Sequence, residues 1–430
     1  DKTRYACDGL TRQRLDKPYV KVDGKLQPAS WDDAFGAIAG KVRNLDGAKI
    51  AAIAGDMCDA EAMSALKDLM EALGSPHIDC RQDGAKLTSG ARAGYIFNTT
   101  IAGIEDADAC LIVGANPRLE APIINARLRK RFVAGGFRVG MVGDAADLTY
   151  RYDHLGAGPQ TLKEIADGTH PFCEVLKAAE RPMLIVGQGA LARDDGAEIL
   201  AAARSIADAT GMIAGDWNGF NVLHTAAARV AGLDLGFVPG NGGRDVAGIL
   251  DDAASGDIEV VYLLGADEID TSNLANAFVV YQGHHGDAGA HVADVVLPGA
   301  AYTEKDGTYA NTEGRVQRGR RATVPPGDAR EDWTIIRALS EVLGKTLPYN
   351  NLGALRVRMA EIAPVLDRID MVETADWAVF GSAGPMGDAA FASPISNFYM
   401  TDPISRASAT MAACTETLVN GGAEKTGTDG

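Results

Sequence analysis

The sequence predicts an α/β protein built from two doubly wound parallel sheets. Short, continuously apolar runs, of the kind that parallel sheets bury on both faces, alternate with helical patterns along the chain. Several such units occur in 430 residues, a length too great for one compact core, which favours two sheets. The 50 glycines are spread between the apolar runs, as expected of tight strand-to-helix turns.

The first 28 residues are polar and predict a small β segment. Within it an Asp-Gly turn at Asp23 separates two short alternating runs, which is a hairpin signal. Ser30 then predicts the N-cap of a helix, because its side-chain oxygen can accept a hydrogen bond from a backbone N–H of the first turn.

A buried strand is predicted at residues 49–55, followed by a helix at residues 60–73. Gly74 predicts the end of this helix, since glycine readily adopts the left-handed conformation that closes many helices. The helix prediction rests on apolar residues at helical spacing, namely Met63, Leu66, Leu69, Met70 and Leu73.

Five further apolar runs predict strands, at residues 109–114, 138–143, 182–187, 259–265 and 277–282. Helices are expected between them, including residues 121–132 and 197–210. The last fifty residues are rich in Gly, Ala, Ser and Thr and have weak periodicity, so they predict an irregular tail. Residues 421–430 predict disorder at its end.

The net charge of −17 argues against several functions. A nucleic-acid-binding protein needs a basic surface to displace counterions from phosphates, and an anionic membrane surface would repel this chain. The charge fits a soluble protein or a subunit with basic partners. No run of about 18 apolar residues predicts a transmembrane helix. Residue 1 is an Asp with no apolar signal segment after it, which predicts that the natural N-terminus is missing.

The cysteines predict free thiols in a reducing compartment, because none belongs to a Cys-x-x-Cys pair and the chain is too long for a disulfide scaffold. No iron–sulfur spacing, Walker loop, His-Glu-x-x-His pair or EF-hand loop occurs. The six are Cys7, Cys58, Cys80, Cys110, Cys173 and Cys414.

The turn that begins at Gly187 could bind a nucleotide. It reads Gly-Gln-Gly-Ala-Leu-Ala between a strand and a helix, and it fits the Gly-x-Gly-x-x-Ala pattern that brings a pyrophosphate to a helix N-terminus. Asp208 lies about twenty residues further on, where an acid could bind a ribose. The alternative is a structural turn, since this class of fold favours glycine wherever a strand leads into a helix.

A histidine-rich loop after Gly283 could bind zinc, for which two histidines and a carboxylate suffice. Its spacing matches no closed structural zinc site, so the alternative is a polar loop at the carboxyl end of a strand. The residues are His284, His285, Asp287, His291 and Asp294.

A run of arginines stands out in this acidic chain. Guanidinium groups suit carboxylates and phosphates, so the run predicts either a solvated face or a contact with an acidic neighbouring protein. It comprises Arg315, Arg318, Arg320 and Arg321.

Residues 300–333 are the most informative stretch; they begin Ala-Tyr-Thr-Glu-Lys-Asp-Gly-Thr-Tyr-Ala-Asn-Thr-Glu-Gly-Arg and end Pro-Gly-Asp-Ala-Arg-Glu-Asp-Trp. Five other segments agree with it, at residues 1–5, 7–18, 114–122, 283–287 and 397–412. Together they resemble the large iron–sulfur subunit of the proton-pumping NADH:quinone oxidoreductase, respiratory complex I. The resemblance runs nearly end to end, but it begins where the iron–sulfur portion of that subunit finishes.

This resemblance implies a molybdopterin-oxidoreductase-like fold in which one α/β domain interrupts another. Residues 29–105 and 255–345 would form the first domain, and residues 106–254 the inserted one. The β segment at residues 1–28 would precede them, and a helical or irregular tail at residues 346–430 would follow. The β-barrel domain that ends the true molybdoenzymes has no expected counterpart.

The resemblance also implies a function in electron transfer from NADH to quinone. This portion would be a cofactor-free scaffold with no catalytic, cofactor-binding or metal-binding residue. The missing N-terminal part would carry one [2Fe–2S] and two [4Fe–4S] clusters, and NADH would bind to another subunit. Some bacterial members bind an additional cluster through closely spaced cysteines; here only Cys7 lies in that neighbourhood, so we expect none.

The expected partners are other peripheral-arm subunits, including the NADH- and flavin-binding subunit and the quinone-proximal iron–sulfur subunits. The expected location is the cytoplasmic side of a bacterial inner membrane or the matrix side of the mitochondrial inner membrane, reached through the complex. No nucleic acid is expected as a partner.

Two other functions stay open. The fold would permit a molybdopterin-dependent oxidoreductase of formate dehydrogenase type, in which the turn comparable to Gly114 lies against the pterin dinucleotide. Such an enzyme usually needs a Cys, selenocysteine or Ser ligand after the second strand, where Cys80 is the only soft ligand. Cys80 lies at the strand end and no His follows, so we expect a lost metal site. The other function is nucleotide binding through the turn at Gly187.

Overall fold

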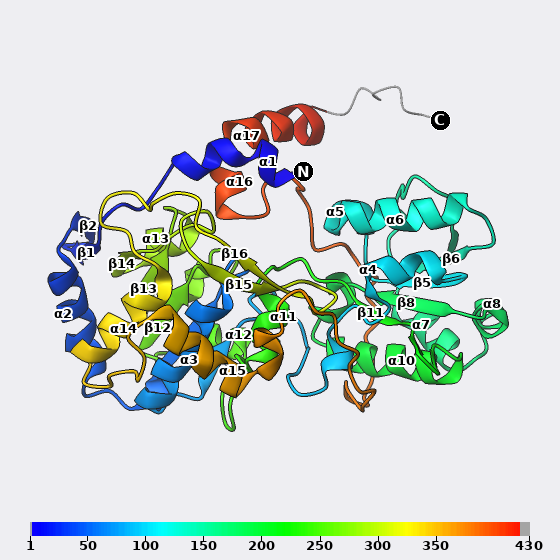
Figure 1. Cartoon of the computed structure of the whole chain (residues 1–430), viewed down its shortest axis with the longest axis horizontal. Coiled ribbons are helices and arrows are strands. Elements are labelled where there is room, and N and C mark those ends of the chain that lie inside the picture. The colour runs from blue at the N-terminus through cyan, green and yellow to red at the C-terminus, as the bar shows by residue number, and fades with distance from the viewer. Residues whose placement is uncertain (1, 422–430) are drawn as a thin grey trace.

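Two parallel-rich sheets lie side by side in the computed structural model, which describes residues 2–421 (Figure 1). The first has seven strands in the order β2-β1-β14-β13-β12-β3-β4, and the second has five in the order β11-β8-β5-β6-β7. All pairings are parallel except those that β1 makes with β2 and β14. The predicted fold class, with two doubly wound sheets, is therefore confirmed.

The first sheet combines strands from distant parts of the chain. They are β1 (Tyr19–Val22), β2 (Lys25–Pro28), β3 (Ile50–Ala54), β4 (His77–Asp79), β12 (Val260–Leu264), β13 (Phe278–Gly283) and β14 (Val295–Pro298). After β3 the chain adds β4 on one side and later β12 on the other, so a topological switch point lies between β3 and β12. The β1–β2 hairpin, predicted as a separate segment, extends this sheet because β1 pairs with β14.

Helices cover both faces of the first sheet, and alternate strand residues point into separate apolar clusters. In β3, Ala51 and Ile53 pack toward α12 (Val246–Ser255) and α13 (Ala288–Val292). Ile50, Ala52 and Ala54 face the other cluster. That cluster includes α2 (Trp31–Val42), α3 (Ala60–Leu73), α14 (Asp332–Val342) and α15 (Leu352–Ile362).

The second sheet is formed entirely between residues 109 and 222. Its strands are β5 (Ala109–Val113), β6 (Arg138–Val142), β7 (Asp153–Gly156), β8 (Pro182–Val186) and β11 (Phe220–Val222). The switch point here lies between β5 and β8. Both interiors are confluent on one side, since one apolar cluster contains residues of both sheets. The domain boundaries given above stay predictions.

Helices also flank the second sheet on both faces. On one face, α6 (Pro122–Val133) contributes Ile124 and Leu128 to the cluster that contains Cys110 and Ile112 of β5. The other helices of this region are α5 (Pro117–Glu120), α7 (Pro159–Ala166), α8 (Phe172–Ala178), α9 (Gln188–Leu191) and α10 (Gly196–Ala209). The helices predicted at residues 121–132 and 197–210 are confirmed to within one residue at each end.

Short elements complete the described part of the chain. Two small hairpins are formed by β9 (Ile213–Ala214) with β10 (Trp217–Asn218) and by β15 (Gly307–Ala310) with β16 (Val316–Gly319). The short helices are α1 (Lys2–Tyr5), α4 (Thr100–Gly103) and α11 (Arg229–Asp234). Single tight turns of helix are η1 (Cys7–Thr11), η2 (Gly47–Lys49), η3 (Arg92–Gly94), η4 (Ile104–Asp106), η5 (Thr271–Leu274), η6 (Pro364–Asp367) and η7 (Glu416–Asn420).

The C-terminal tail is irregular, as predicted, until it forms α16 (Pro403–Ala407) and α17 (Ala409–Thr415). These two helices lie beside the N-terminal segment (Figure 1). Asp8 stabilises the start of α17 by accepting hydrogen bonds from the Ser408 hydroxyl and the Ala409 amide. Residues 422–430, in the segment predicted to be disordered, lie outside the described residues. Among residues 2–421, no helix has both the length and the apolar character needed to cross a bilayer.

Candidate functional site

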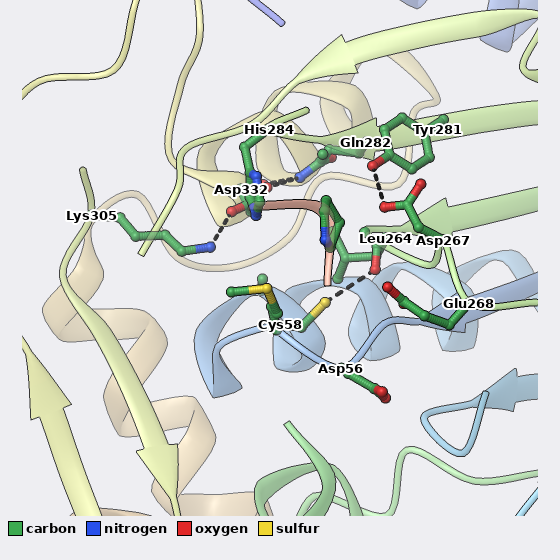
Figure 2. Close-up of a pocket in the computed structure, with 15 residues that line it drawn as sticks. Asp56, Cys58, Leu264, Asp267, Glu268, Tyr281, Gln282, His284, Lys305 and Asp332 are labelled. Atoms are coloured by element: carbon green, nitrogen blue, oxygen red, sulfur yellow. Dashed lines mark hydrogen bonds and ion pairs between the residues drawn. The ribbon is translucent and has the colours of Figure 1, made fainter. Parts of the chain in front are cut away.

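The carboxyl ends of β3 and β12 form the candidate site, at the switch point where doubly wound sheets bind their ligands (Figure 2). The two strand ends approach so closely that a Cβ on Gly55 would lie 1.7 Å from the carbonyl oxygen of Gly265. The cavity between them measures about 30 Å³. That is room for water, whereas small-molecule pockets usually measure roughly 300–1,000 Å³.

Lys305 fills the centre of this site with a buried ion cluster. Its Nζ lies 2.7 Å from Asp59 Oδ2 and 2.5 Å from Asp332 Oδ2, and none of the three side chains is more than 7% exposed. Burial alone would lower the pKa of Lys305, but the attraction of Asp332 and Asp59 outweighs it and raises the pKa well above its usual range. Lys305 is therefore charged and shared between two carboxylates.

Neighbouring strands fix the orientation of Asp332. The side-chain amide of Gln282 on β13 donates to Asp332 Oδ1 over 2.9 Å, and the hydroxyl of Tyr262 on β12 donates to Gln282 Oε1 over 2.5 Å. Both bonds are buried. A fully paired group of this kind has no free donor aimed at a substrate, so it acts to hold β12, β13 and α14 together.

Two carboxyl groups beside the cluster titrate near neutral pH. Burial raises the pKa of Asp267 to about 7, although Asp267 accepts hydrogen bonds from the Tyr281 hydroxyl (2.7 Å) and the Gly289 amide (2.9 Å). Burial also raises the pKa of Asp56 to about 7, against the attraction of Arg229. Perturbed acids of this kind occur at active sites and at structural networks alike.

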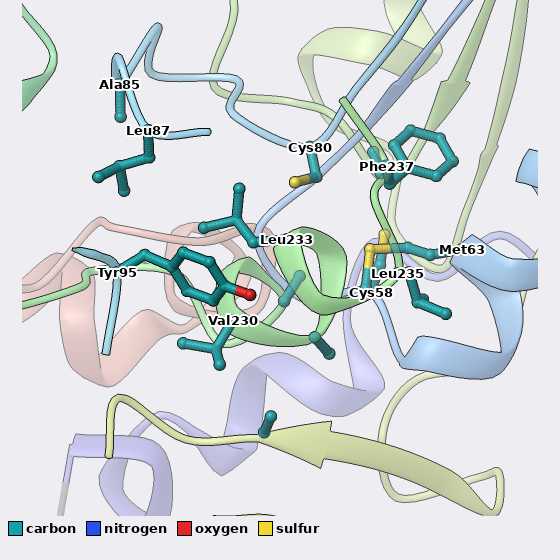
Figure 3. Packing of buried hydrophobic residues seen from close by; sticks show 14 of the residues in the cluster. Cys58, Met63, Cys80, Ala85, Leu87, Tyr95, Val230, Leu233, Leu235 and Phe237 are labelled. Atoms are coloured by element: carbon teal, nitrogen blue, oxygen red, sulfur yellow. The ribbon is translucent and has the colours of Figure 1, made fainter. Parts of the chain in front are cut away.

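The two cysteines near this edge are poor metal ligands, because a ligand must be a thiolate. The Cys58 thiol donates to the Leu264 carbonyl oxygen over 3.1 Å, and burial raises its pKa well above the usual range. Cys80, the ligand candidate from the sequence, is 1% exposed and lies among Leu233 and Phe237 (Figure 3). Burial raises its pKa to about 12. Cys80 is thus part of an apolar core.

The histidines of the predicted zinc loop bind to the protein itself. His284 Nδ1 and His285 Nδ1 lie 2.5 Å apart, so that one proton is shared between them. The other ring nitrogen of His285 forms a 2.9 Å hydrogen bond with the Gly9 carbonyl oxygen. His291 is exposed and does not join them.

The two carboxylates of the same loop are bound in different places. Asp287 accepts a 2.6 Å hydrogen bond from Arg406 of α16. Asp294 pairs with Lys21 of β1 at 3.1 Å. Across residues 2–421, no three or more His, Cys, Asp or Glu side chains are grouped so that they could hold a metal ion. The five residues of the predicted zinc loop therefore do not converge.

The structure brings the turns at Gly114 and Gly187 together, at the switch point of the second sheet. A Cβ on Gly187 would lie 2.6 Å from the Gly114 carbonyl oxygen. Gly114 has a φ of +56°, a conformation that favours glycine. Asp208, the predicted ribose-binding acid, instead lies at the far end of α10, where it accepts a 2.8 Å hydrogen bond from Trp377 Nε1.

The arginine run divides into paired and exposed side chains. Arg315 donates to Glu313 over 2.9 Å, and Arg318 lies 3.6 Å from Asp367. Arg320 and Arg321 are exposed. A groove of about 570 Å³ opens beside β16. Its walls include Arg318, Arg320 and Arg356 together with Asp306 and Asp370.

Sequence reasoning missed the ion cluster of Lys305, Asp59 and Asp332. Asp59 reads as the N-cap of α3, and Asp332 as an acidic residue in the first turn of α14. Lys305 reads as part of a polar loop. The one signal was indirect, since residues 300–333, which carry the family resemblance, contain both Lys305 and Asp332.

Two protein families match the chain. Residues 14–342 match molybdopterin oxidoreductase, and residues 371–414 match the C-terminal region of the large, 75 kDa-type subunit of NADH-ubiquinone oxidoreductase. The match to the first family covers well over half of the chain, and the second follows it along the sequence.

Relatives of known identity match nearly the whole chain. It is 46% identical over 425 residues to the mitochondrial NADH dehydrogenase [ubiquinone] iron-sulfur protein 1 of Solanum tuberosum, covering 97% of this chain and 56% of that protein. It is 41% identical over 433 residues to the NADH-ubiquinone oxidoreductase 75 kDa subunit of Reclinomonas americana, covering 96% and 62%. The homologous NADH-quinone oxidoreductase subunit of Rickettsia bellii is 42% identical over 416 residues, covering 97% and 60%. The chain thus spans little more than half the length of these relatives.

The fold also matches a solved structure. Acetylene hydratase from Pelobacter acetylenicus superposes with a TM-score of 0.59 over 85% of this chain and 66% of that chain. The sequence identity is 14%, so the likeness concerns the fold alone.

Proposed function

This chain belongs to the molybdopterin oxidoreductase family and is a homologue of the 75 kDa-type iron–sulfur subunit of NADH:quinone oxidoreductase; on that premise we propose that it is the cofactor-free scaffold of such a subunit. The observation that carries the proposal is the ion cluster at the first switch point. Lys305, Asp59 and Asp332 occupy the space beside the strand ends and leave a cavity of about 30 Å³. A pterin dinucleotide is far larger than this cavity, so the residues present do not fit that cofactor.

The chemistry of the donor set supports the same function. A molybdenum site needs an accessible soft ligand, whereas the Cys80 thiol is buried in an apolar core and its pKa is raised to about 12. The chain would therefore act through its shape. In the complex, one [2Fe–2S] and two [4Fe–4S] clusters would be carried by a preceding N-terminal part. A rigid α/β body would hold that part at fixed distances from its neighbours, as electron transfer between clusters requires.

The partners in this proposal are the other peripheral-arm subunits of complex I, including the NADH- and flavin-binding subunit and the quinone-proximal iron–sulfur subunits. The groove beside β16 is our candidate contact with one of them. Arg318 and Arg320 project there from an acidic chain, and Nη2 of Arg356 is buried without a hydrogen-bond partner. These groups suit an acidic segment of a neighbouring protein, because guanidinium groups bind carboxylates in pairs of hydrogen bonds.

The experiment that tests the proposal uses native membranes solubilised in mild detergent. A non-denaturing gel is probed for this chain and stained in the same lane for NADH oxidation. We expect the chain to migrate with a very large NADH-oxidising band, on the cytoplasmic side of a bacterial inner membrane or the matrix side of a mitochondrial one. A band near 45 kDa without NADH oxidation would contradict the proposal.

Metal and pterin analysis tests the cofactor-free part separately. The purified chain is analysed for molybdenum by mass spectrometry and for a fluorescent pterin after acid oxidation. We expect neither at more than trace amounts. Stoichiometric molybdenum with pterin would support a molybdopterin-dependent oxidoreductase, of formate dehydrogenase type, in place of a scaffold.

A further inference from the structure

The C-terminal tail runs along α10 toward the switch point of the second sheet. Trp377 binds Asp208 near the C-terminal end of the helix, and the Ser382 amide donates to the Ala197 carbonyl oxygen over 3.0 Å near its beginning. The Gly387 amide donates to Asp195 over 2.7 Å, at the residue that precedes the helix. The tail therefore follows α10 from its last turn to its first, and then reaches the carboxyl edge of the sheet.

Residues 389–393 cross that edge directly over the two glycine turns. A Cβ on Gly189 would lie 2.0 Å from the carbonyl oxygen of Ala392, so only glycine allows the tail to approach this closely. On the other turn, the Ser393 hydroxyl donates to Glu120 Oε1 over 3.0 Å. The same oxygen accepts a hydrogen bond from the Asn116 amide over 2.7 Å. Both turns singled out in the sequence are thus in contact with one short peptide.

Phe391 anchors this peptide. It is 1% exposed, its amide donates to the Ala157 carbonyl oxygen over 2.8 Å, and its carbonyl oxygen accepts from the Asp144 amide over 3.1 Å. The guanidinium of Arg193 lies over the ring at 5.5 Å and donates to the Ala389 carbonyl oxygen over 2.9 Å. The peptide therefore uses backbone hydrogen bonds, an aromatic ring and a cation, the same kinds of contact that a bound nucleotide would use.

We propose that residues 389–393 are an intramolecular ligand that permanently occupies the switch-point crevice of the second sheet, in the place where this class of fold binds a nucleotide. Ligands of open α/β sheets bind outside the carboxyl ends of the strands at the switch point, and here that position lies between β5 and β8. The turn at Gly187 is consequently a docking site for the tail. No diphosphate can reach the backbone amides of this turn while the tail is bound.

The location of the tail in the family match supports this inference. Residues 389–393 fall inside the stretch that matches the C-terminal region of the complex I subunit, whereas the molybdopterin oxidoreductase match ends at residue 342. The same C-terminal stretch also covers the first switch point. Pro403 lines the small cavity there, and Arg406 binds Glu268 and Asp287, each over 2.6 Å. One segment that lies beyond the molybdopterin oxidoreductase match thus covers both crevices.

The test combines hydrogen exchange with thermal unfolding of the full chain. In the unaltered chain, we expect the Phe391 amide to be protected as strongly as amides of β6, and millimolar GDP or NADH to leave the unfolding temperature unchanged. Phe391→Ala should speed exchange in residues 389–393 and in both glycine turns, and lower the unfolding temperature by at least about 5 °C. Phe398→Ala removes the same ring from the tail outside the crevice and should leave exchange at both turns unchanged.

Two results would overturn the proposal. One is stabilisation of the unaltered chain by GDP or NADH together with loss of protection at residues 389–393, which would make the tail a displaceable lid over a working nucleotide site. The other is exchange of the Phe391 amide at the rate of an unstructured peptide. Both are measured on the unaltered chain, so the proposal stays testable if Phe391→Ala does not fold.

Discussion

Lys305 Nζ lies 2.7 Å from Asp59 Oδ2, deep below the surface where the first sheet would otherwise open into a ligand crevice. One cation there serves two carboxylates, since Asp332 lies at 2.5 Å from the same nitrogen. Removing the cation would leave two negative charges buried without a partner. That is much more costly than replacing the whole cluster by apolar side chains.

Replacement of Lys305 by methionine should therefore lower the free energy of unfolding by about 3–5 kcal/mol at pH 7, the usual cost of breaking a buried ion pair. Urea unfolding measures this change. Lys49→Met is the matched control, because Lys49 pairs with Glu259 while both side chains are nearly half exposed, and it should change stability far less. A change below about 1 kcal/mol for Lys305→Met would show that the cluster is not the structural centre of the site.

Asp267 should make stability decrease with rising pH. Burial raises its pKa to about 7 in the folded chain, from about 4 when unfolded. Between these values the folded state keeps a proton that the unfolded state has lost, so stability falls as pH rises through this window, by at most about 1.4 kcal/mol per pH unit. Asp267→Asn should remove this contribution. Urea unfolding of both proteins at several pH values from 4.5 to about 8 gives the difference; parallel pH profiles would contradict the assignment.

Gly55 should not tolerate a side chain, because a Cβ there would overlap the Gly265 carbonyl oxygen at 1.7 Å and neither backbone can move freely between buried strands. We expect Gly55→Ala to cost roughly 3 kcal/mol or more, or to prevent folding. Gly36→Ala is the matched control in the exposed part of α2, where nothing lies within 4 Å of the added Cβ; it should stabilise by up to about 1 kcal/mol. Thermal unfolding of both variants tests the contrast, and equal melting temperatures would refute it.

The thiols should fall into two kinetic classes. Cys7 is exposed and Cys414 partly exposed, whereas the other four cysteines are buried. In native protein we expect a disulfide reagent such as DTNB to modify Cys7 rapidly and the buried thiols, Cys80 included, only after unfolding, because modification needs an accessible thiolate. Cys7→Ser should remove the fast phase. Rapid modification of Cys80 in native protein, seen by peptide mapping, would show that it is accessible and reopen its assignment as a metal ligand.

The inner strands could be predicted from the sequence because they are buried on both faces and read as continuous apolar runs. This holds for β3, β5, β8 and β12, each five residues long and buried throughout. The strands that sequence reasoning missed, such as β4 and β11, have three residues, too few to show a period. Their identity as strands depends on the neighbour with which they pair.

The candidate site was less predictable, for a topological reason. Asp59 and Lys305 are 246 positions apart, and only the switch in strand order brings the ends of β3 and β12 together. The glycine turns at Gly114 and Gly187 were recognised, but their ligand was not. Nothing in the local pattern indicates that residues 389–393, in an irregular and glycine-rich tail, return to cover them.

The arginine groove beside β16 gives the proposed scaffold a prediction about assembly. Arg320 is exposed there, and reversing its charge together with that of Arg318 should repel an acidic partner. We expect Arg318→Glu/Arg320→Glu to fold normally but to weaken association with the NADH-oxidising complex by roughly 10-fold, more at low salt than at high salt because salt screens exposed charges. Native gels run after incubation at increasing salt measure the dissociation.

Arg151→Glu is the control for this experiment, since Arg151 is an exposed arginine beside the second sheet, remote in sequence from the groove. If the double variant and Arg151→Glu release the complex at the same salt concentration, net charge rather than the groove governs assembly. If the double variant alone dissociates earlier, the groove contacts an acidic partner. The otherwise unpaired Nη2 of Arg356 then has a place in that interface, because a partner carboxylate in the groove would supply its missing acceptor.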